Sequence, residues 1–382
     1  MKTKSSLLKN NAVQSLLCSL ICVILGVFIG YIVLLLINPT GAGKAILSVI
    51  KNFFFYPEGP ARAKYFGGTL VKAAPLVMCS LSILFAYKVG LFNIGVAGQY
   101  VAGAGACLYA ALAWQCPWYV CLLLAIAAGA VFGALSGILK AYCNVNEVIS
   151  GIMLNWIGLY AVNILLTNVK EAASPYTNNL SSFNASALLP TMGLNKLFGN
   201  NQYVTIAIPL AILSAIVIAV ILEKTKFGYE LKATGNNPNA AKYCGMAEKR
   251  NIILTLAIGG ALAGLGASLL YQTGYEQWQC TYSSVPSMGF NGIAVAFLGG
   301  LSPFGSILAS FFIQHITNGG GYVDKTMYCS QISDLISAII IYLCGFVLFL
   351  RQFINSRIAK AEERKAELAM QEETENAVGG DE

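Results

Sequence analysis

The sequence has few charged residues, and this scarcity excludes an ordinary soluble protein. Only 11% of its 382 residues are Asp, Glu, Lys or Arg, whereas a soluble domain carries about 25%. At the same time 57% of the residues are hydrophobic and the mean hydropathy is +0.66. Too little polar surface is available to cover such a chain in water, so we predict an integral membrane protein.

Acidic residues are especially rare in the apolar part of the chain. Of the 17 Asp and Glu residues, eight follow Leu350 and nine are spread over the first 350 residues. The basic residues of this part fall mostly in short polar segments, where Lys and Arg set the orientation of a membrane protein. The net charge of +7 therefore indicates membrane topology, and we expect no nucleic-acid partner.

Residues for catalysis or metal binding are also scarce. The chain has a single histidine, His315, and its eleven cysteines show neither a CxxC pair nor metal-ligand spacing. It also lacks the Gly-rich loop ending in Gly-Lys-Ser/Thr that binds the phosphates of ATP. We therefore predict no catalytic residues, no metal site and no cofactor bound by this chain, and His315 is interpreted as a polar residue at a helix contact.

Long apolar runs predict an all-α polytopic membrane protein with about ten transmembrane helices. Most runs approach the roughly 20 residues that a spanning helix needs, and the first run is too long for a signal-peptide core. The runs at 285–301 and 304–316 are short, so we expect short or discontinuous spans there. The runs cover residues 13–37, 70–87, 91–113, 118–139, 147–167, 203–222, 252–271, 285–301, 304–316 and 332–350.

Ten spans divide the permeation domain expected at residues 1–350 into two halves. The first half covers residues 12–168, a polar outer loop covers 169–202, and the second half covers 203–350, followed by a charged cytoplasmic tail at 351–382. Five spans per half force the halves into opposite orientations, with both termini in the cytoplasm. A faint repeat agrees: Phe92-Asn93-Ile94-Gly95 opens the third span, and Phe290-Asn291-Gly292-Ile293 lies early in the eighth.

Four basic residues oppose this topology, because they fall in the segment predicted to lie outside: Lys44, Lys51, Arg62 and Lys64. Within that segment, polar residues recur at helical spacing up to about Tyr56, which is typical of an interfacial helix.

A polar stretch at residues 223–250 divides the apolar second half. It carries six Lys or Arg and three Glu, and its local signals predict a short helix over about 239–244. Asn237 suits the N-cap, Pro238 the first helical position and Gly245 the left-handed stop. The small Ala240 and Ala241 beside Tyr243 would let another surface approach closely. An ordinary cytoplasmic loop and a docking element are equally compatible with this pattern.

Five amides lie within the predicted spans, where polar side chains usually face a cavity or a partner helix: Asn93, Gln99, Asn155, Asn163 and Asn291. Amides both donate and accept hydrogen bonds, so they suit neutral solutes with hydroxyl groups or bases. The aromatic residues Phe92, Trp156 and Phe290 each lie next to one of these amides in the sequence and could stack on such solutes. The alternative interpretation is that the amides bond one helix to another.

Several motifs resemble those of ABC-transporter permeases of the branched-chain amino acid, ribose and nucleoside importer group. They are Gly90-Leu-Phe-Asn-Ile-Gly-Val-Ala-Gly-Gln99, Asn146-Glu-Val-Ile149 with Met153-Leu-Asn155, Gly289-Phe-Asn-Gly-Ile-Ala-Val-Ala296, and Gly235-Asn-Asn-Pro238 followed by residues 240–245. The resemblance covers nearly the whole chain from about Gly68 to Leu350. Its branch is similar to the nucleoside or simple-sugar permeases that work with a basic-membrane-protein type binding lipoprotein.

The resemblance implies a fold similar to type II ABC importers and a subunit of an ATP-driven importer in the bacterial cytoplasmic membrane, surrounded by lipid. Implied partners are an ATP-binding subunit that binds ATP and Mg, an identical or different second permease chain, and an extracellular binding lipoprotein. The path residues that we single out are Phe92, Asn93, Gln99, Asn155, Phe290 and Asn291. The coupling residues are Gly235, Asn237, Pro238, Ala240, Ala241, Tyr243 and Gly245.

Nucleosides are the solute that this branch implies, and a simple sugar or another small neutral solute is the alternative. The family branch commonly has Glu where this chain has Ala97, so a solute or gating contact there is absent or altered. A stand-alone secondary carrier is a further alternative, although the scarcity of ionisable groups within the spans argues against it.

Overall fold

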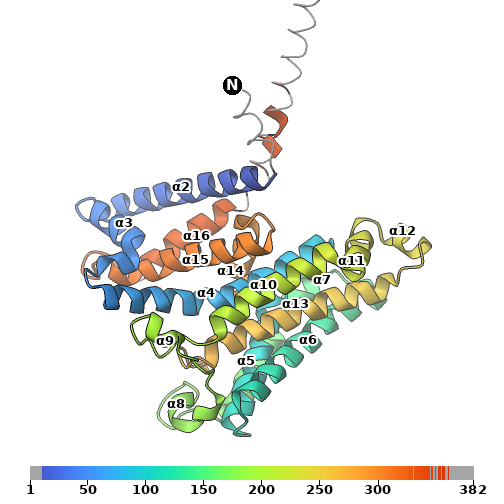
Figure 1. The fold of residues 1–382 in the computed structure, drawn as a ribbon, viewed down its shortest axis with the longest axis horizontal. Coiled ribbons are helices and arrows are strands. Elements are labelled where there is room, and N and C mark those ends of the chain that lie inside the picture. The colour runs from blue at the N-terminus through green and yellow to red at the C-terminus, as the bar shows by residue number, and fades with distance from the viewer. Residues whose placement is uncertain are drawn as a thin grey trace, which may run out of the picture.

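The computed structural model describes residues 11–329 and 331–344, together with scattered positions from 346 to 360. Within these residues the ordered elements are helices (Figure 1). Two isolated β-bridges, Lys170 with Thr177 and Tyr176 with Gln279, also lie within these residues. Residues 361–382 of the predicted tail lie outside the described residues.

The helices follow one another along the chain with mostly short connections, apart from the segment between α7 and α10 and the one between α13 and α14. Their bounds are α2 (Asn11–Ile37), α3 (Ala42–Lys51), η1 (Asn52–Phe55), α4 (Gly59–Lys88), α5 (Val96–Leu112), α6 (Trp118–Cys143), α7 (Glu147–Thr167), α8 (Leu180–Phe183), η2 (Ala185–Ala187), α9 (Leu194–Leu197), α10 (Ala207–Lys224), α11 (Lys226–Asn236), α12 (Pro238–Tyr243), α13 (Glu248–Tyr271), α14 (Ser287–Leu298), α15 (Pro303–Gly319), η3 (Gly320–Tyr322) and α16 (Ile332–Cys344).

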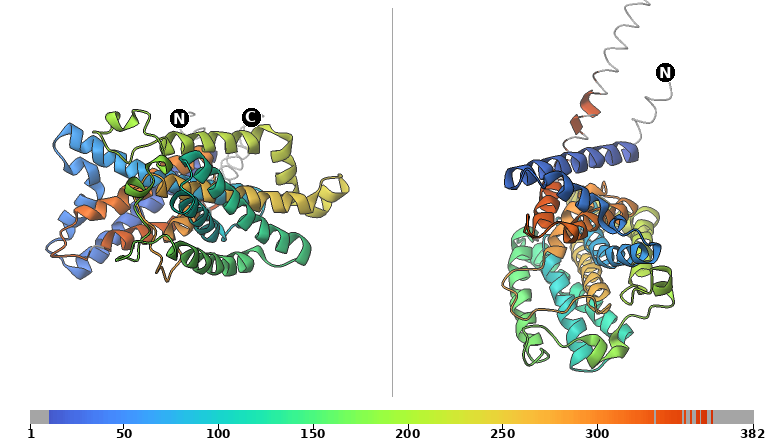
Figure 2. Two further views of the ribbon diagram at one scale, coloured as in Figure 1. Left: turned by 90° about the horizontal axis from the view of Figure 1, so that it is seen from below. Right: turned by 90° about the vertical axis from the view of Figure 1, so that its left-hand side faces the viewer.

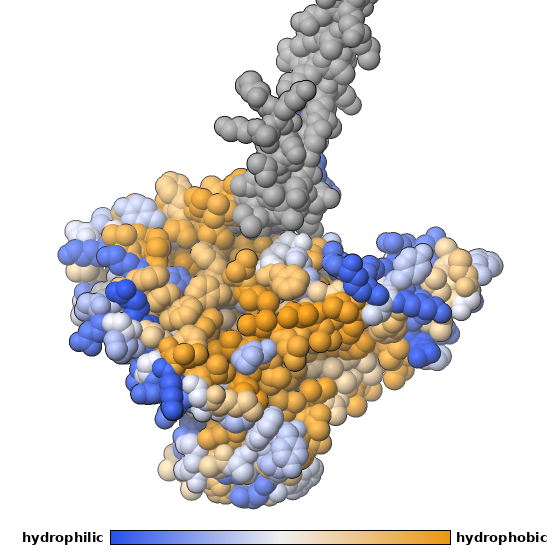
Figure 3. Space-filling view, in the orientation of Figure 1, coloured by the Kyte–Doolittle hydropathy of each residue, from blue (hydrophilic) through white to orange (hydrophobic). Residues whose placement is uncertain are grey.

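Six of the described helices are long and apolar enough to cross a membrane: α2, α4, α6, α7, α10 and α13. Three further apolar segments, in α5, α14 and α16, are shorter. Figure 3 shows an apolar band between a hydrophilic end that carries α3 and α9, which we call the loop end, and a hydrophilic end that carries α11 and α12, the hairpin end. The protein is therefore a polytopic helical membrane protein.

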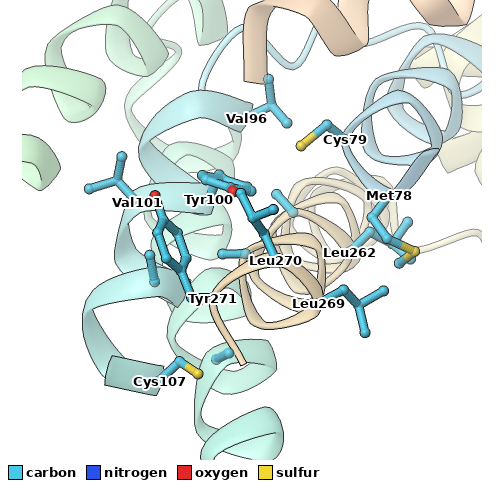
Figure 4. Packing of buried hydrophobic residues seen from close by; sticks show 14 of the residues in the cluster. Met78, Cys79, Val96, Tyr100, Val101, Cys107, Leu262, Leu269, Leu270 and Tyr271 are labelled. Atoms are coloured by element: carbon cyan, nitrogen blue, oxygen red, sulfur yellow. The ribbon is translucent and has the colours of Figure 1, made fainter. Parts of the chain in front are cut away.

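The centre of the bundle is formed by α4 and α13. Of their most apolar windows, 89% and 61% of the residues are buried, against 28% for α6 and α10. Figure 4 shows how Met78 and Cys79 of α4 and Leu262 and Leu270 of α13 pack near Tyr100 of α5. The peripheral helices expose their aliphatic side chains, as expected for surfaces that face lipid.

Glycines allow α6 and α13 to approach closely. A Cβ atom at Gly133 would overlap the carbonyl oxygen of Leu256, and one at Gly129 would overlap that of Gly260. Gly264 of α13 stands in the same way against Ala125. Without a hydrophobic driving force between helices in lipid, such close backbone contact supplies the packing attraction.

A second, smaller core joins α2 to the last helices of the chain. Gly26 of α2 stands against Ile340 of α16, and Gly30 stands against Ile336. Figures 1 and 2 place α2 at one edge of the bundle with α16 beside it. The first and last predicted spans therefore pack together.

The segment expected to form an interfacial helix folds as α3 followed by η1. The left-handed backbone of Asn52 (φ +43°) separates the two elements. The Asn52 amide donates to the His315 carbonyl at 2.7 Å, and its Nδ2 lies 3.3 Å from the ring Nδ1 of His315. The prediction that His315 is a polar residue at a helix contact is thus confirmed.

Two span boundaries differ from the predicted ones. The second span was expected over 70–87, but α4 begins at Gly59, because the charged Arg62 and Lys64 continue the helix beyond the apolar run. The third was expected from Leu91, but α5 begins only at Val96, after a non-helical turn that starts at Gly90 (φ +79°).

The two short apolar runs fold as separate helices, α14 and α15. Gly300 and Leu301 have φ values of +65° and +54°, and Pro303 starts α15 in the first helical position. With 12 residues, α14 is about 18 Å long, well short of the roughly 30 Å hydrocarbon core.

Candidate functional site

The turn before α5 holds two of the predicted path amides in a closed pair. Asn93 donates to the Gln99 side-chain oxygen at 2.8 Å, and Gln99 donates back to Asn93 at 3.0 Å. Asn93 also donates to the Ser82 hydroxyl of α4 at 3.0 Å. With exposures of 3% and 1%, both amides are buried and satisfied, so this pair fixes the shape of the turn.

Asn155 of α7 caps the start of α5 from the neighbouring helix. Its oxygen accepts from the Gly98 backbone N–H at 2.7 Å, and its nitrogen donates to the Ile94 carbonyl at 3.1 Å. The first N–H groups of a helix have no partner within the helix, and α5 has no side-chain cap of its own. The alternative interpretation of the amides, that they bond one element to another, holds for Asn155.

Phe290 and Asn291 of α14 are less buried than the amides described above. Phe290 is 39% exposed, and Asn291 is partly exposed and makes no side-chain hydrogen bond to the part of the chain that the structure describes. Phe92, in the turn before α5, is also partly exposed. These residues, unlike the three buried amides, present groups that a solute could contact.

The start of α14 packs against the start of α5. Gly289, just before Phe290, packs against the Cα atom of Ala97 in the first turn of α5. Three residues further along α14, Gly292 packs against Cys79 and Ser80 of α4. The structure therefore places the start of α14, which carries Phe290 and Asn291, beside the first turn of α5.

The polar stretch forms a helical hairpin, α11 and α12, that projects from the bundle (Figures 1 and 2). The predicted signals of its second helix are confirmed: the Asn237 side chain accepts from the Ala240 N–H at 3.0 Å, Pro238 starts the helix, and Gly245 follows it at φ +79°. The longer α11 before it was missed, although Thr225 caps it by accepting from the Gly228 N–H at 3.0 Å.

The tip of this hairpin is open to a partner. Tyr243 is 92% exposed, while Ala241 faces inward at 3%. Three helices supply the hairpin and its base with cations: Lys226 and Lys232 lie on α11, Lys242 on α12, and Lys249 on α13. Aromatic side chains are enriched in protein–protein interfaces, so this exposed ring suits contact with a partner protein.

The base of the hairpin is attached to the turn that leads to the amide pair. Gly235 packs so closely on Val89 and Gly90 that a Cβ atom there would overlap the Val89 carbonyl. Asn251 of α13 donates to the Thr234 hydroxyl at 2.8 Å and holds α11 from the other side. Only three residues separate Val89 from Asn93, so the hairpin is connected directly to the candidate path.

An ion pair between α4 and the connection that follows α13 was not predicted from the sequence. Lys72 Nζ lies 3.1 Å from the Glu276 carboxylate and 5.1 Å from the ring centre of Tyr275. Its neighbours Val71 and Ala73 are 0% and 4% exposed, and an isolated Lys in an apolar run was the signal available. Lys72 is an ionisable residue near the start of the span predicted at 70–87, and it is an exception among the spans, which we expect to hold almost no ionisable groups.

The described residues contain no group of three or more His, Cys, Asp or Glu that could hold a metal ion. Cys116, Cys280 and Cys329 are free. Burial raises the pKa of the Cys280 thiol, which makes the reactive thiolate less abundant.

Comparison with known proteins identifies a matching family and several proteins of similar sequence. Residues 65–345 match the family described as branched-chain amino acid transport system / permease component. The chain is 33% identical to the nucleoside ABC transporter permease protein NupB of Lactococcus lactis over 96% of this chain and 100% of the relative. It is 32% identical to the guanosine ABC transporter permease protein NupP of Bacillus subtilis, covering 90% and 97% of the two chains.

A glucose ABC transporter permease protein, TsgB13 of Haloferax volcanii, is 28% identical over 82% of each chain. No solved structure matches the chain.

Proposed function

Because the chain belongs to the branched-chain amino acid transport system permease family, we propose that it forms, with a second permease chain, the nucleoside path of an ATP-driven importer. It is the permease subunit and not the ATPase. The observation that carries the choice of solute is the match to NupB, a nucleoside permease protein, which extends over 96% of this chain and the whole of the relative.

The path runs along α14 and the start of α5. Phe290 and Asn291 are partly exposed, so they contact the solute by stacking and by hydrogen bonds. Asn93, Gln99 and Asn155 are buried and paired, so they form the wall behind the path and keep the α5 turn in place. Ala97 lacks a polar group, and the close approach of Gly289 there takes the place of the acidic contact common in this branch.

The α11–α12 hairpin is the docking element for the ATP-binding subunit. The capped α12 with its exposed Tyr243 enters a groove on that subunit, and Gly235 passes the movement to Val89 and Gly90. From there the turn through Asn93 reaches the path. ATP and Mg bind to the partner subunit, and the hairpin of this chain transmits the movement of that subunit to the path.

We further propose ten transmembrane helices in two inverted halves, as in type II importers. The six long helices together with α5, α14, α15 and α16 make ten. The short α14 and the repeated Phe-Asn sequence near the starts of α5 and α14 support an inverted arrangement. The hairpin end then faces the cytoplasm of a bacterial plasma membrane, with both termini, and the loop end receives the extracellular binding lipoprotein.

The proposal is tested by reconstitution into liposomes with the ATP-binding subunit, the second permease and the binding lipoprotein. Uptake of labelled guanosine, uridine and glucose is compared with and without ATP. ATP-dependent uptake of a nucleoside, competed by other nucleosides, supports the proposal. ATP-dependent uptake of glucose alone favours a sugar importer, for which the similarity to TsgB13 speaks. Counterflow with this chain alone would instead identify a secondary carrier.

A further inference from the structure

The connection between α13 and α14, residues Gln272–Pro286, is partly buried in the protein interior, and we call it the strap. Its Trp278 is fully buried at 0% exposure, and Gln272 and Thr273 are buried at 0% and 5%. The strap leads directly into α14, which begins without a side-chain cap. The position of Phe290 and Asn291 therefore depends on where the strap is held.

One attachment of the strap is built into the protein interior. The Trp278 indole N–H donates to the Asn163 oxygen of α7 at 3.0 Å, and the Asn163 nitrogen donates to the Tyr282 carbonyl at 2.9 Å. Breaking these bonds would leave buried polar groups without partners. This attachment is a fixed point of the strap.

The strap is also joined to the loop between α7 and α10. Its Trp278 carbonyl accepts from the Thr177 N–H at 2.8 Å, and its Cys280 N–H donates to the Pro175 carbonyl at 2.8 Å. The Gln277 amide donates to the Glu171 carboxylate at 3.0 Å. A protein that docks on this loop therefore acts on the strap through main-chain bonds.

The attachment to α4 is of a different kind. Lys72 and Glu276 meet at 3.1 Å with side-chain exposures of 25% and 39%. Partly exposed ion pairs contribute little to stability, because both charges are also solvated when apart. This attachment can open at low cost.

We propose that Lys72 and Glu276 are positioning residues of the transport cycle. Their ion pair holds the strap on α4 and fixes the start of α14, and the pair separates when the strap moves to admit solute at the loop end. Asn163 and Trp278 remain joined and act as the pivot. This inference rests on the proposed function for its direction, but the movement of the strap can be measured without any solute.

The test uses the complete transporter in membranes, with a reporter thiol introduced by Asn291→Cys. The rate of labelling by a small, charged, membrane-impermeant methanethiosulfonate is measured, and the chain without the reporter gives the background from native thiols. Glu276→Gln removes the ion pair and should raise the labelling rate roughly three- to tenfold, because the open position becomes more populated. Lys72→Glu combined with Glu276→Lys restores the pair and should return the rate to within about twofold of the parent.

The chain offers a matched control at the hairpin end. Lys140 and Glu147 form an ion pair at 2.9 Å with exposures of 28% and 15%. Lys140→Gln removes an equivalent interaction and should leave the labelling rate unchanged. A rate in Glu276→Gln equal to that of the parent, or an equal rise in Lys140→Gln, overturns the proposal.

Uptake measured on the same variants without the Asn291→Cys reporter separates the two claims, because Asn291 itself is proposed to contact the solute. If labelling responds as stated but the parent takes up no nucleoside, the proposed solute is wrong and the positioning role of Lys72 and Glu276 stands. If the parent takes up nucleosides and Glu276→Gln changes neither labelling nor the KM and maximal rate of uptake, the positioning role is wrong and the proposed function stands.

Discussion

At the scale of single residues, buried amides do more than line a cavity. Asn155 supplies the cap that α5 lacks, and Asn163 holds the strap on α7. Sequence indicated which amides lie in the membrane, because they interrupt apolar runs. It could not indicate their partners, since Gly98 and Asn155 are 57 positions apart and their contact depends on how α5 and α7 pack.

The Asn155 cap makes a testable contribution to stability. Asn155→Ala leaves the Gly98 N–H and the Ile94 carbonyl without their partner, which we expect to lower the free energy of unfolding by about 1–3 kcal/mol. The measurement is thermal unfolding of the purified protein in detergent. Asn168→Ala, on an exposed residue at the end of the same helix, should cause almost no change, and equal midpoints for both variants would contradict the role of the cap.

At the scale of elements, the packing of α6 on α13 depends on glycines four residues apart. Gly133→Leu would place a side chain in the space of the Leu256 carbonyl, and overpacking of this kind costs about 1–3 kcal/mol or more. We expect a lower yield of folded protein and a lower unfolding temperature. Gly43→Ala is the control, because nothing lies within 4 Å of the added carbon; unchanged stability of Gly133→Leu would show that the two helices do not pack so closely.

The hairpin is the element whose role is easiest to isolate. Tyr243 is 92% exposed, so Tyr243→Ala should not affect folding of this chain. We expect it to weaken binding of the ATP-binding subunit about tenfold or more, as truncation of a central aromatic residue does at interfaces. Co-purification and titration of the two subunits measure this.

Tyr119→Ala provides the matched control for the hairpin variant. Tyr119 is 53% exposed and lies in the first turn of α6, away from the hairpin (Figure 1). It should leave binding of the ATP-binding subunit unchanged. Equal affinities of the Tyr243→Ala variant and the parent would remove the hairpin from the interface.

At the scale of the whole molecule, apolar runs predicted the membrane class and most helices, and cap residues predicted α12 almost to the residue. The predicted boundaries failed where a helix continues beyond its apolar run, as α4 does at Gly59, or where a turn lies within one, as before Val96. Lys72 and the strap escaped prediction because their partners are supplied by distant segments. The number of spans and the orientation of the halves stay predictions.

The central claim is that the ATP-binding subunit docks on the hairpin from the cytoplasmic side, and labelling of Cys244 tests this claim most directly. Cys244 caps the end of α12 and is exposed, and the exposed Cys329 lies between α15 and α16. With Cys143, the other exposed native thiol of the described residues, replaced by Ser, a membrane-impermeant maleimide is applied to intact cells and to permeabilised cells. The account predicts that Cys329 is labelled in intact cells and Cys244 only after permeabilisation. Labelling of Cys244 in intact cells would contradict it.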